Sequence, residues 1–182
     1  MNHITELDIL RDVVRRLESA GIEYMLTGSL AMNYYATPRM TRDIDLVVAL
    51  NMDDSGRLKQ LFEGDYYIPE DSLVHALATH GMFNLVHLES VAKVDIIVRK
   101  DEDYRHEEFA RRQRVRLSDF DAWIVSREDL ILSKLVWAKP SHSDLQLRDI
   151  ANLINLDIDT KYLRQWAPRL DVAGLLEDCL NE

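Results

Sequence analysis

The chain contains a single cysteine, and this scarcity excludes two structural devices. Cys179 has no second cysteine with which to form an intramolecular disulfide, and one thiol cannot build a cysteine-rich zinc site. The six histidines do not follow a recognised zinc-binding spacing either. Because an unpaired thiol is typical of a reducing compartment, we expect a cytoplasmic protein.

Long apolar runs are also lacking. No segment approaches the roughly 18 consecutive apolar residues of a transmembrane helix, so we expect no membrane association. The first ten residues lack the basic start and apolar stretch of a signal peptide. With 182 residues, 47% of them hydrophobic, the chain is long enough to bury a sizeable core.

The chain has no excess of positive charge. Its formal net charge is -10, so no global field attracts nucleic acid, and charge of this size also simply favours solubility. One basic run leaves local RNA binding open: Arg111, Arg112, Arg114 and Arg116. Because Glu107 and Glu108 precede this run, we favour an ordinary solvated face over an RNA site.

The hydrophobic pattern predicts an α/β (α+β) fold, with a mixed β-sheet flanked by helices. Strands are expected at 22–27, 43–50, 82–88 and 91–98, with further short strands at 115–117 and 123–125. The mixed-charge segment 99–116 is interpreted as surface, and Pro140 is expected to end a helix that follows Ser126. We therefore predict a catalytic core over 1–125 and a C-terminal helical region over 126–182, packed on that core.

A Gly-Ser pair stands between a predicted strand and a predicted helix. Gly28 and Ser29 follow the strand 22–27 and open the helix 29–35. Backbone N–H groups at a helix N-terminus are an anion-binding site. A Gly-Ser pair alone is more commonly a simple turn, so its neighbours decide the interpretation.

Three aspartates lie on predicted strands. Asp43 and Asp45 alternate, so they point to the same face with Cβ atoms roughly 6.5–7 Å apart. Asp95 lies mid-strand, where a buried carboxylate needs a partner. If the two strands are neighbours in register, all three carboxylates meet, and such sets hold Mg²⁺ in phosphoryl transfer. The alternatives are solvated or capping aspartates, with Asp95 paired to Lys93.

The order of these motifs resembles that of the polymerase-beta-type nucleotidyltransferase superfamily, in which Gly-Ser, a D-x-D pair and a later aspartate follow one another. Residues 39–46, RMTRDIDL, are similar to the R-x-T-x-D-I-D-L motif of the AbiEii-type branch. That branch contains nucleotidyltransferase-like toxins of abortive-infection and toxin-antitoxin systems. Its helical E-x-L…K-L and R-D motifs resemble Glu128 to Leu135 and Arg148-Asp149.

The resemblance implies a nucleotidyltransferase fold and an enzyme that transfers a nucleoside monophosphate from a nucleoside triphosphate to an acceptor hydroxyl. It assigns the catalytic and metal-binding roles, with two Mg²⁺ ions as cofactor, to Asp43, Asp45 and Asp95. It assigns nucleotide binding to Gly28, Ser29, Arg39, Thr41, Lys134 and Asp149. An antitoxin partner is also implied, while RNA, protein and small-molecule acceptors all stay open.

Alternatives remain for the helical residues and for the function. Lys134 lies among apolar helix positions and can also be a lysine that extends to solvent, and Asp149 can simply pair with Arg148 or with an adjacent helix. Trp137 and the other two tryptophans are interpreted as core or interface anchors. The same fold without turnover would be a nucleotide-binding module, and an antibiotic-modifying small-molecule nucleotidyltransferase is the third alternative.

Overall fold

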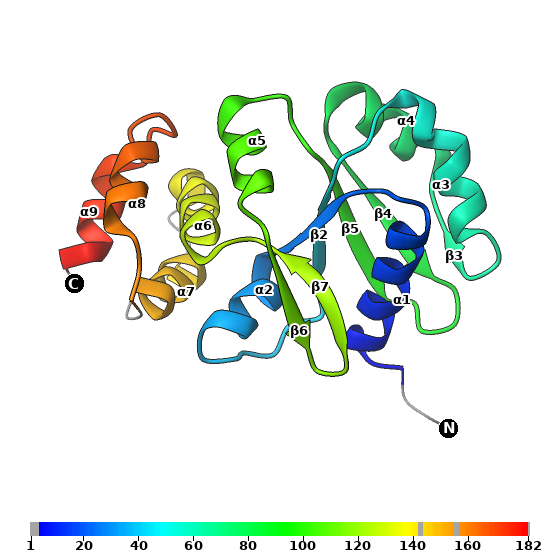
Figure 1. Ribbon diagram of the computed structural model, residues 1–182, viewed down its shortest axis with the longest axis horizontal. Coiled ribbons are helices and arrows are strands. Elements are labelled where there is room, and N and C mark those ends of the chain that lie inside the picture. The colour runs from blue at the N-terminus through cyan, green and yellow to red at the C-terminus, as the bar shows by residue number, and fades with distance from the viewer. Residues whose placement is uncertain (1–3, 142–143, 155–156, 182) are drawn as a thin grey trace.

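The computed structural model describes residues 4–141, 144–154 and 157–181, and these residues form one mixed β-sheet with helices around it (Figure 1). The strands are β1 (Tyr24–Thr27), β2 (Ile44–Val48), β3 (Tyr66–Tyr67), β4 (Met82–His87), β5 (Lys93–Val98), β6 (Gln113–Leu117) and β7 (Phe120–Ile124). Their order in the sheet is β3-β4-β5-β2-β1-β7-β6. The predicted α/β fold class is confirmed.

The helices fall into two groups in the chain. The first group is α1 (Glu6–Ser19), α2 (Gly28–Tyr35), α3 (Ser55–Phe62), α4 (Glu70–Thr79) and α5 (Asp103–Ala110), with a 3₁₀ turn at Met52–Asp54. The second group is α6 (Arg127–Ser141), α7 (Asp144–Ile154), α8 (Thr160–Trp166) and α9 (Ala173–Asn181). Figure 1 shows the second group together at one end of the molecule, away from α1, α3 and α4. None of the helices in the described ranges is long and apolar enough to cross a membrane.

The centre of the sheet combines parallel and antiparallel pairing. Strand β2 runs antiparallel to β1 and parallel to β5, and β4 returns antiparallel to β5. The expected hairpin of 82–88 and 91–98 is therefore present, with slightly shorter strands. This arrangement brings β1, β2 and β5, the three strands that carry the candidate site, next to one another.

The two faces of the central strands differ in burial. Ile44, Leu46 and Val48 of β2 are fully buried, whereas Asp45 and Val47 between them are only partly buried. The same alternation along β5 buries every second residue, from Val94 to Val98. The buried face joins the apolar sides of α1, α3 and α4 in the hydrophobic core. The opposite face is left for polar side chains.

Two differences from the sequence-based prediction bear on the site. Strand β2 begins at Ile44 and ends at Val48, so Asp43 lies one residue before it and is exposed. The segment 99–116 is not only surface: it forms α5, which buries Tyr104, Glu108 and Phe109, and most of β6. Most of the segment is exposed or partly exposed, as the surface interpretation expected, but the buried side of α5 was missed because its apolar positions are sparse among charges.

The prediction for Pro140 was also wrong, because α6 continues through that residue to Ser141. Pro140 is the residue before the last described residue of α6, and its missing N–H costs the helix one i→i−4 hydrogen bond. The predicted cap at Ser143 lies outside the described residues. The predicted cap at the start of α6 is present, since the Asp129 amide donates to Ser126 Oγ at 3.2 Å.

Candidate active site

Two aspartates face each other at the centre of the sheet. Asp45 of β2 and Asp95 of β5 are direct partners in the parallel pair, which is the register that the sequence analysis required. Asp43 lies just before β2, and all three aspartates line one cavity of about 680 Å³. The fold therefore brings the three predicted carboxylates to a common space.

Burial and the proximity of other carboxylates raise the pKa values of Asp45 and Asp95. Burial, together with the charges of Asp95 and Asp43, raises the pKa of Asp45 to about 6. Burial also raises the pKa of Asp95, and Asp43 adds to this effect, while a hydrogen bond from Asn84 opposes it. Uncompensated negative charge is thus concentrated on this wall of the cavity, as expected of a site for cations.

Asn84 is a site residue that the sequence analysis did not identify. It lies on β4 directly opposite Asp95, and its side-chain Nδ2 donates to Asp95 Oδ1. This hydrogen bond fixes the orientation of the Asp95 carboxylate. A polar residue within the apolar strand 82–88 was the available signal, and pairing the predicted hairpin would have placed it beside Asp95.

Gly28 makes the close approach of β1 and β2 possible. Its φ is +68°, and a Cβ atom at this position would lie 2.0 Å from Asp45 Oδ2. A side chain of any size would therefore displace the carboxylate or the helix start. Because α2 begins at Gly28, the free backbone N–H groups of its first turn lie beside Asp45.

Four predicted nucleotide-site residues form one polar network. Arg39 Nη2 donates to Ser29 Oγ at 2.6 Å, and the Arg39 guanidinium makes two hydrogen bonds of 3.1 Å to Asp149. Lys134 Nζ contacts Asp149 Oδ2 at 2.8 Å and Gln146 Oε1 at 3.1 Å. The loop after α2 is thus tied to α6 and α7.

Lys134 does not extend to solvent. Its side chain is 1% exposed, so the solvent-exposed alternative is wrong, and Asp149 pairs with Lys134 and Arg39, not with Arg148. Burial lowers the pKa of Lys134, although Asp149 opposes this shift. Burial acts to raise the pKa of Asp149, but the hydrogen bonds from Arg39 and Lys134 hold it below its ordinary value.

The remaining predicted residues lie at the edge of the site. Thr41 does not line the cavity; its Oγ1 accepts a hydrogen bond of 3.2 Å from the Asp43 amide and so shapes the turn before β2. Arg39 is held by Asn33, whose side chain bonds both the N–H and the carbonyl oxygen of Arg39, at 3.0 and 2.8 Å. These contacts position the loop that carries Asp43.

The donor set of the cavity suits Mg²⁺ bound together with phosphate. Mg²⁺ prefers oxygen ligands and is commonly held by one or two carboxylates plus substrate phosphates. In residues 4–141, 144–154 and 157–181, no three Asp, Glu, His or Cys side chains are gathered around a single point as a ready-made metal site. The residues present fit an ion whose coordination a phosphate completes, with Asp45, Asp95 and Asp43 supplying carboxylate oxygens.

The basic run on β6 and before it is engaged in ion pairs. Arg111 pairs with Asp129, and the following three arginines pair with Glu23, Glu18 and Asp121, respectively. The acidic partners neutralise most of the positive charge. This agrees with the interpretation of the run as an ordinary solvated face.

Comparison with solved structures shows that the chain has the nucleotidyltransferase fold. An antigenic nucleotidyltransferase-like protein from Paracoccidioides brasiliensis is 19% identical, with a TM-score of 0.61 over 97% of this chain and 92% of its own. The antibiotic-resistance factor ANT(2")-Ia, solved in complex with adenylyl-2"-tobramycin, is 13% identical, with a TM-score of 0.60 over 90% of this chain and 95% of its own. The lincosamide antibiotic adenylyltransferase LnuA, bound to lincomycin, is 19% identical, with a TM-score of 0.52 over 84% and 98%. No protein-family profile and no curated protein sequence matches the chain.

Proposed function

We propose that this chain is a magnesium-dependent nucleotidyltransferase that moves a nucleoside monophosphate from a nucleoside triphosphate to an acceptor hydroxyl. The observation that carries the proposal is the pairing of Asp45 with Asp95 on adjacent strands, beside Gly28 at the start of α2. Carboxylates, a helix N-terminus and a buried lysine around one cavity are the chemistry that a triphosphate and its cations require.

Each residue has a definite task in this proposal. Asp43, Asp45 and Asp95 would hold Mg²⁺, which when bound supplies neutralisation of the triphosphate charge. The N–H groups at Gly28 and Ser29, with Lys134, would bind the phosphates. Arg39 and Asp149 would keep Ser29 and Lys134 in place through the network described above.

The reaction itself needs positioning more than covalent chemistry. The acceptor oxygen forms a bond to the α-phosphorus while the bond from that phosphorus to the bridging oxygen breaks, and pyrophosphate leaves. Asp95 is the residue that we propose takes the proton from the acceptor hydroxyl. Asn84 donates to Asp95 Oδ1, and in this proposal the other carboxylate oxygen takes the proton.

Metal-dependent nucleotide binding tests this proposal. Calorimetry with a non-hydrolysable nucleoside triphosphate analogue is expected to show binding that requires Mg²⁺. Asp43→Asn combined with Asp45→Asn should weaken that binding at least tenfold. A double variant that binds as tightly as the parent would disprove the metal-site assignment.

A matched control distinguishes loss of the metal site from a simple loss of negative charge. Asp53 and Asp178 are exposed and do not line the cavity, so Asp53→Asn with Asp178→Asn changes the net charge equally. This control should bind the analogue like the parent. Transfer of label from an α-phosphate-labelled nucleotide then distinguishes a turnover enzyme from a nucleotide-binding module.

A small-molecule acceptor is the second candidate, favoured by the antibiotic adenylyltransferases among the structures of the same fold. Incubation of the protein with labelled nucleotide and either lincomycin or tobramycin tests it, and an adenylylated product would support it. The assignment to the AbiEii-type branch, with an antitoxin partner, is also a proposal. It rests on residues 39–46 and predicts a tight complex with a co-expressed neighbouring gene product.

A further inference from the structure

One wall of the cavity is built by α5 and α6. Arg105 and Glu108 lie three residues apart on α5, and Ser133 and Trp137 lie four apart on α6, so each pair shares one side of its helix. All four line the cavity. None of them belongs to the phosphate or metal site proposed above, and we call these four residues the α5–α6 wall.

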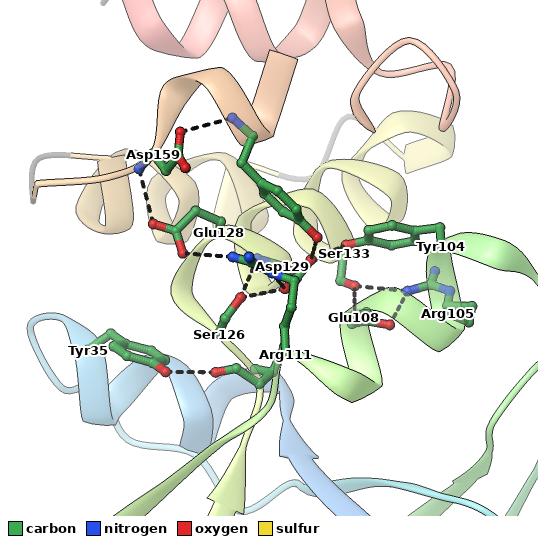
Figure 2. Close-up of polar contacts among 12 residues, drawn as sticks. Tyr35, Tyr104, Arg105, Glu108, Arg111, Ser126, Glu128, Asp129, Ser133 and Asp159 are labelled. Carbon is green, nitrogen blue, oxygen red and sulfur yellow. Dashed lines mark hydrogen bonds and ion pairs between the residues drawn. The ribbon is translucent and has the colours of Figure 1, made fainter. Parts of the chain in front are cut away.

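Three of these residues form a compact buried cluster, shown in Figure 2. Arg105 Nη1 donates to Glu108 Oε2 at 2.9 Å, and Ser133 Oγ donates to Glu108 Oε1 at 2.6 Å. Arg105 Nη1 also contacts Ser133 Oγ at 3.0 Å. Glu108 and Ser133 are 3% and 2% exposed and bond each other, so the cluster is fixed in place, and Arg105, whose side chain is 19% exposed, is its most accessible member.

Charge distinguishes this wall from the phosphate side of the cavity. On the phosphate side, Arg39 and Lys134 share the anion Asp149, and the carboxylates of Asp43, Asp45 and Asp95 and the cations Arg99 and Lys100 also line the cavity. On the α5–α6 wall the cation Arg105 is matched by the anion Glu108. The paired cluster therefore has no net charge of its own, which suits an uncharged polar group.

Trp137 adds a flat apolar surface to this wall. It lies one helical turn after Ser133 and three residues after Lys134, and it is 38% exposed. Along α6, Trp137 therefore follows Lys134, which we assign to phosphate binding, and it lies on the same side of the helix as Ser133. An indole face beside fixed donors and acceptors is the combination that recognises a heterocyclic base.

We propose that the α5–α6 wall seats the nucleobase of the bound nucleotide, with the base stacked on Trp137 and its polar edge facing Arg105 and Glu108. This inference rests on the proposed nucleotidyl transfer, since it places the nucleoside half of the same substrate. It leaves the space next to Asp95 and Asn84 for the acceptor.

The test compares ligands that share phosphates but differ in the base. Binding of the non-hydrolysable analogues of ATP, GTP, CTP and UTP, and of inorganic tripolyphosphate, is measured by calorimetry with Mg²⁺. Trp137→Leu should weaken the best nucleotide about 5- to 100-fold, and Trp137→Phe should restore most of the loss. Tripolyphosphate should bind both variants within about twofold of the parent, since it has no base.

A control variant and a second site variant sharpen the result. Trp123 lies on β7 outside the cavity, so Trp123→Leu should leave nucleotide binding unchanged. Glu108→Gln keeps the shape of the side chain and exchanges one acceptor for a donor, so the ranking of the four analogues should change by more than threefold. This second variant tests the contact with the polar edge of the base independently of stacking on Trp137.

The outcomes separate this inference from the proposed function. If the parent binds no nucleotide, both the proposed function and the nucleobase placement are disproved. If the parent binds but Trp137→Leu binds equally well, or loses tripolyphosphate to the same extent, only the nucleobase placement is overturned. An unchanged ranking in Glu108→Gln would remove the role of the cluster in reading the base.

Discussion

At the scale of single residues, Asp45 combines a negative charge with partial burial, and the candidate site depends on this unfavourable combination. Its carboxylate is partly buried, it lies opposite Asp95, and its pKa rises to about 6. Such a group destabilises the folded protein while it is charged and unliganded. Functional sites commonly retain strain of this kind, because a bound cation relieves it.

Replacement of Asp45 by asparagine should therefore stabilise the protein in the absence of metal. Between about pH 4 and pH 6 the folded state binds more protons than the unfolded state, so the free energy of unfolding falls as pH rises through this window. Asp45→Asn removes this loss and should be more stable by on the order of 1–2 kcal/mol at pH 7.5. Denaturant unfolding in EDTA at pH 4 and pH 7.5 measures it. A difference that does not depend on pH would contradict the account.

Gly28 allows a test with a closely matched control. Gly28→Ala forces a Cβ atom against Asp45, whereas Gly21 has a similar φ of +65° and nothing within 4 Å of the added Cβ. Both substitutions should cost about 1–2 kcal/mol of unfolding free energy from backbone strain. Only Gly28→Ala should cost clearly more and also weaken metal-dependent nucleotide binding at least tenfold. Equal effects of the two variants on binding would show that the close approach is not needed.

At the scale of secondary-structure elements, one buried ion pair joins α6 to α7 beside the cavity. Lys134 and Asp149 are 1% and 2% exposed, and Arg39 adds a second cation from the loop after α2. The three elements are thereby held in one arrangement around Ser29. Removal of Asp149 leaves both cations without their anion, whereas removal of Lys134 leaves Asp149 paired with Arg39.

The two single substitutions should differ in cost. Asp149→Asn leaves Lys134 buried with no anion in the pair, and should destabilise by roughly 3–5 kcal/mol. Lys134→Met leaves Asp149 paired with Arg39, so its cost should be smaller. Urea unfolding of the two variants and of the double variant gives the coupling between them. A larger cost for Lys134→Met would mean that Arg39 does not compensate Asp149.

At the scale of the whole molecule, Asp129 connects the C-terminal helices to the sheet core. Its buried carboxylate accepts hydrogen bonds from Arg111 Nε at 3.0 Å and from Tyr162 of α8 at 2.7 Å, and from Ser126 at the start of α6 (Figure 2). The Arg111 guanidinium also lies over the Tyr162 ring, 3.8 Å from its centroid. Elements from both predicted regions, 1–125 and 126–182, therefore meet at one carboxylate.

We expect both regions to unfold in one cooperative transition. Asp129→Asn should lower the free energy of unfolding by about 3 kcal/mol, since it leaves Arg111 without its buried anion. Glu128→Gln, the adjacent residue, keeps an oxygen that accepts from the Asp159 amide and should cost less than about 1 kcal/mol. Near- and far-ultraviolet circular dichroism should give coincident melting curves for the parent. Two separate transitions would show that the two regions unfold independently, which would contradict the prediction.

Much of the fold could be predicted from the sequence because its central strands alternate clearly. The alternation around Asp45 and around Asp95 gave both strands and the face of each aspartate. The structure adds what alternation does not contain, namely which strands are neighbours and how Asn84 meets Asp95. Strand pairing is a non-local choice, so a single sequence leaves it open.

The α5–α6 wall could not be predicted from the sequence for a different reason. Arg105 and Glu108 lie in a segment where charges outnumber apolar residues, and Glu108 becomes buried where both residues meet Ser133 of α6. Such a contact between distant segments is not visible in the local pattern. Pro140 misled in the opposite direction, since the local rule ends the helix at about Lys139 whereas α6 is described to Ser141.

The central claim is that Asp43, Asp45 and Asp95 hold a metal–nucleotide complex beside the start of α2. A crystal structure with Mn²⁺ in place of Mg²⁺ and a non-hydrolysable nucleoside triphosphate analogue tests it most directly, because anomalous scattering locates the metal. The account predicts Mn²⁺ bound between the carboxylate oxygens of Asp45 and Asp95 and the phosphates, at about 2.0–2.3 Å, with phosphate oxygens at the Gly28 and Ser29 amides. Metal and phosphates bound elsewhere, with this cavity empty, would contradict it.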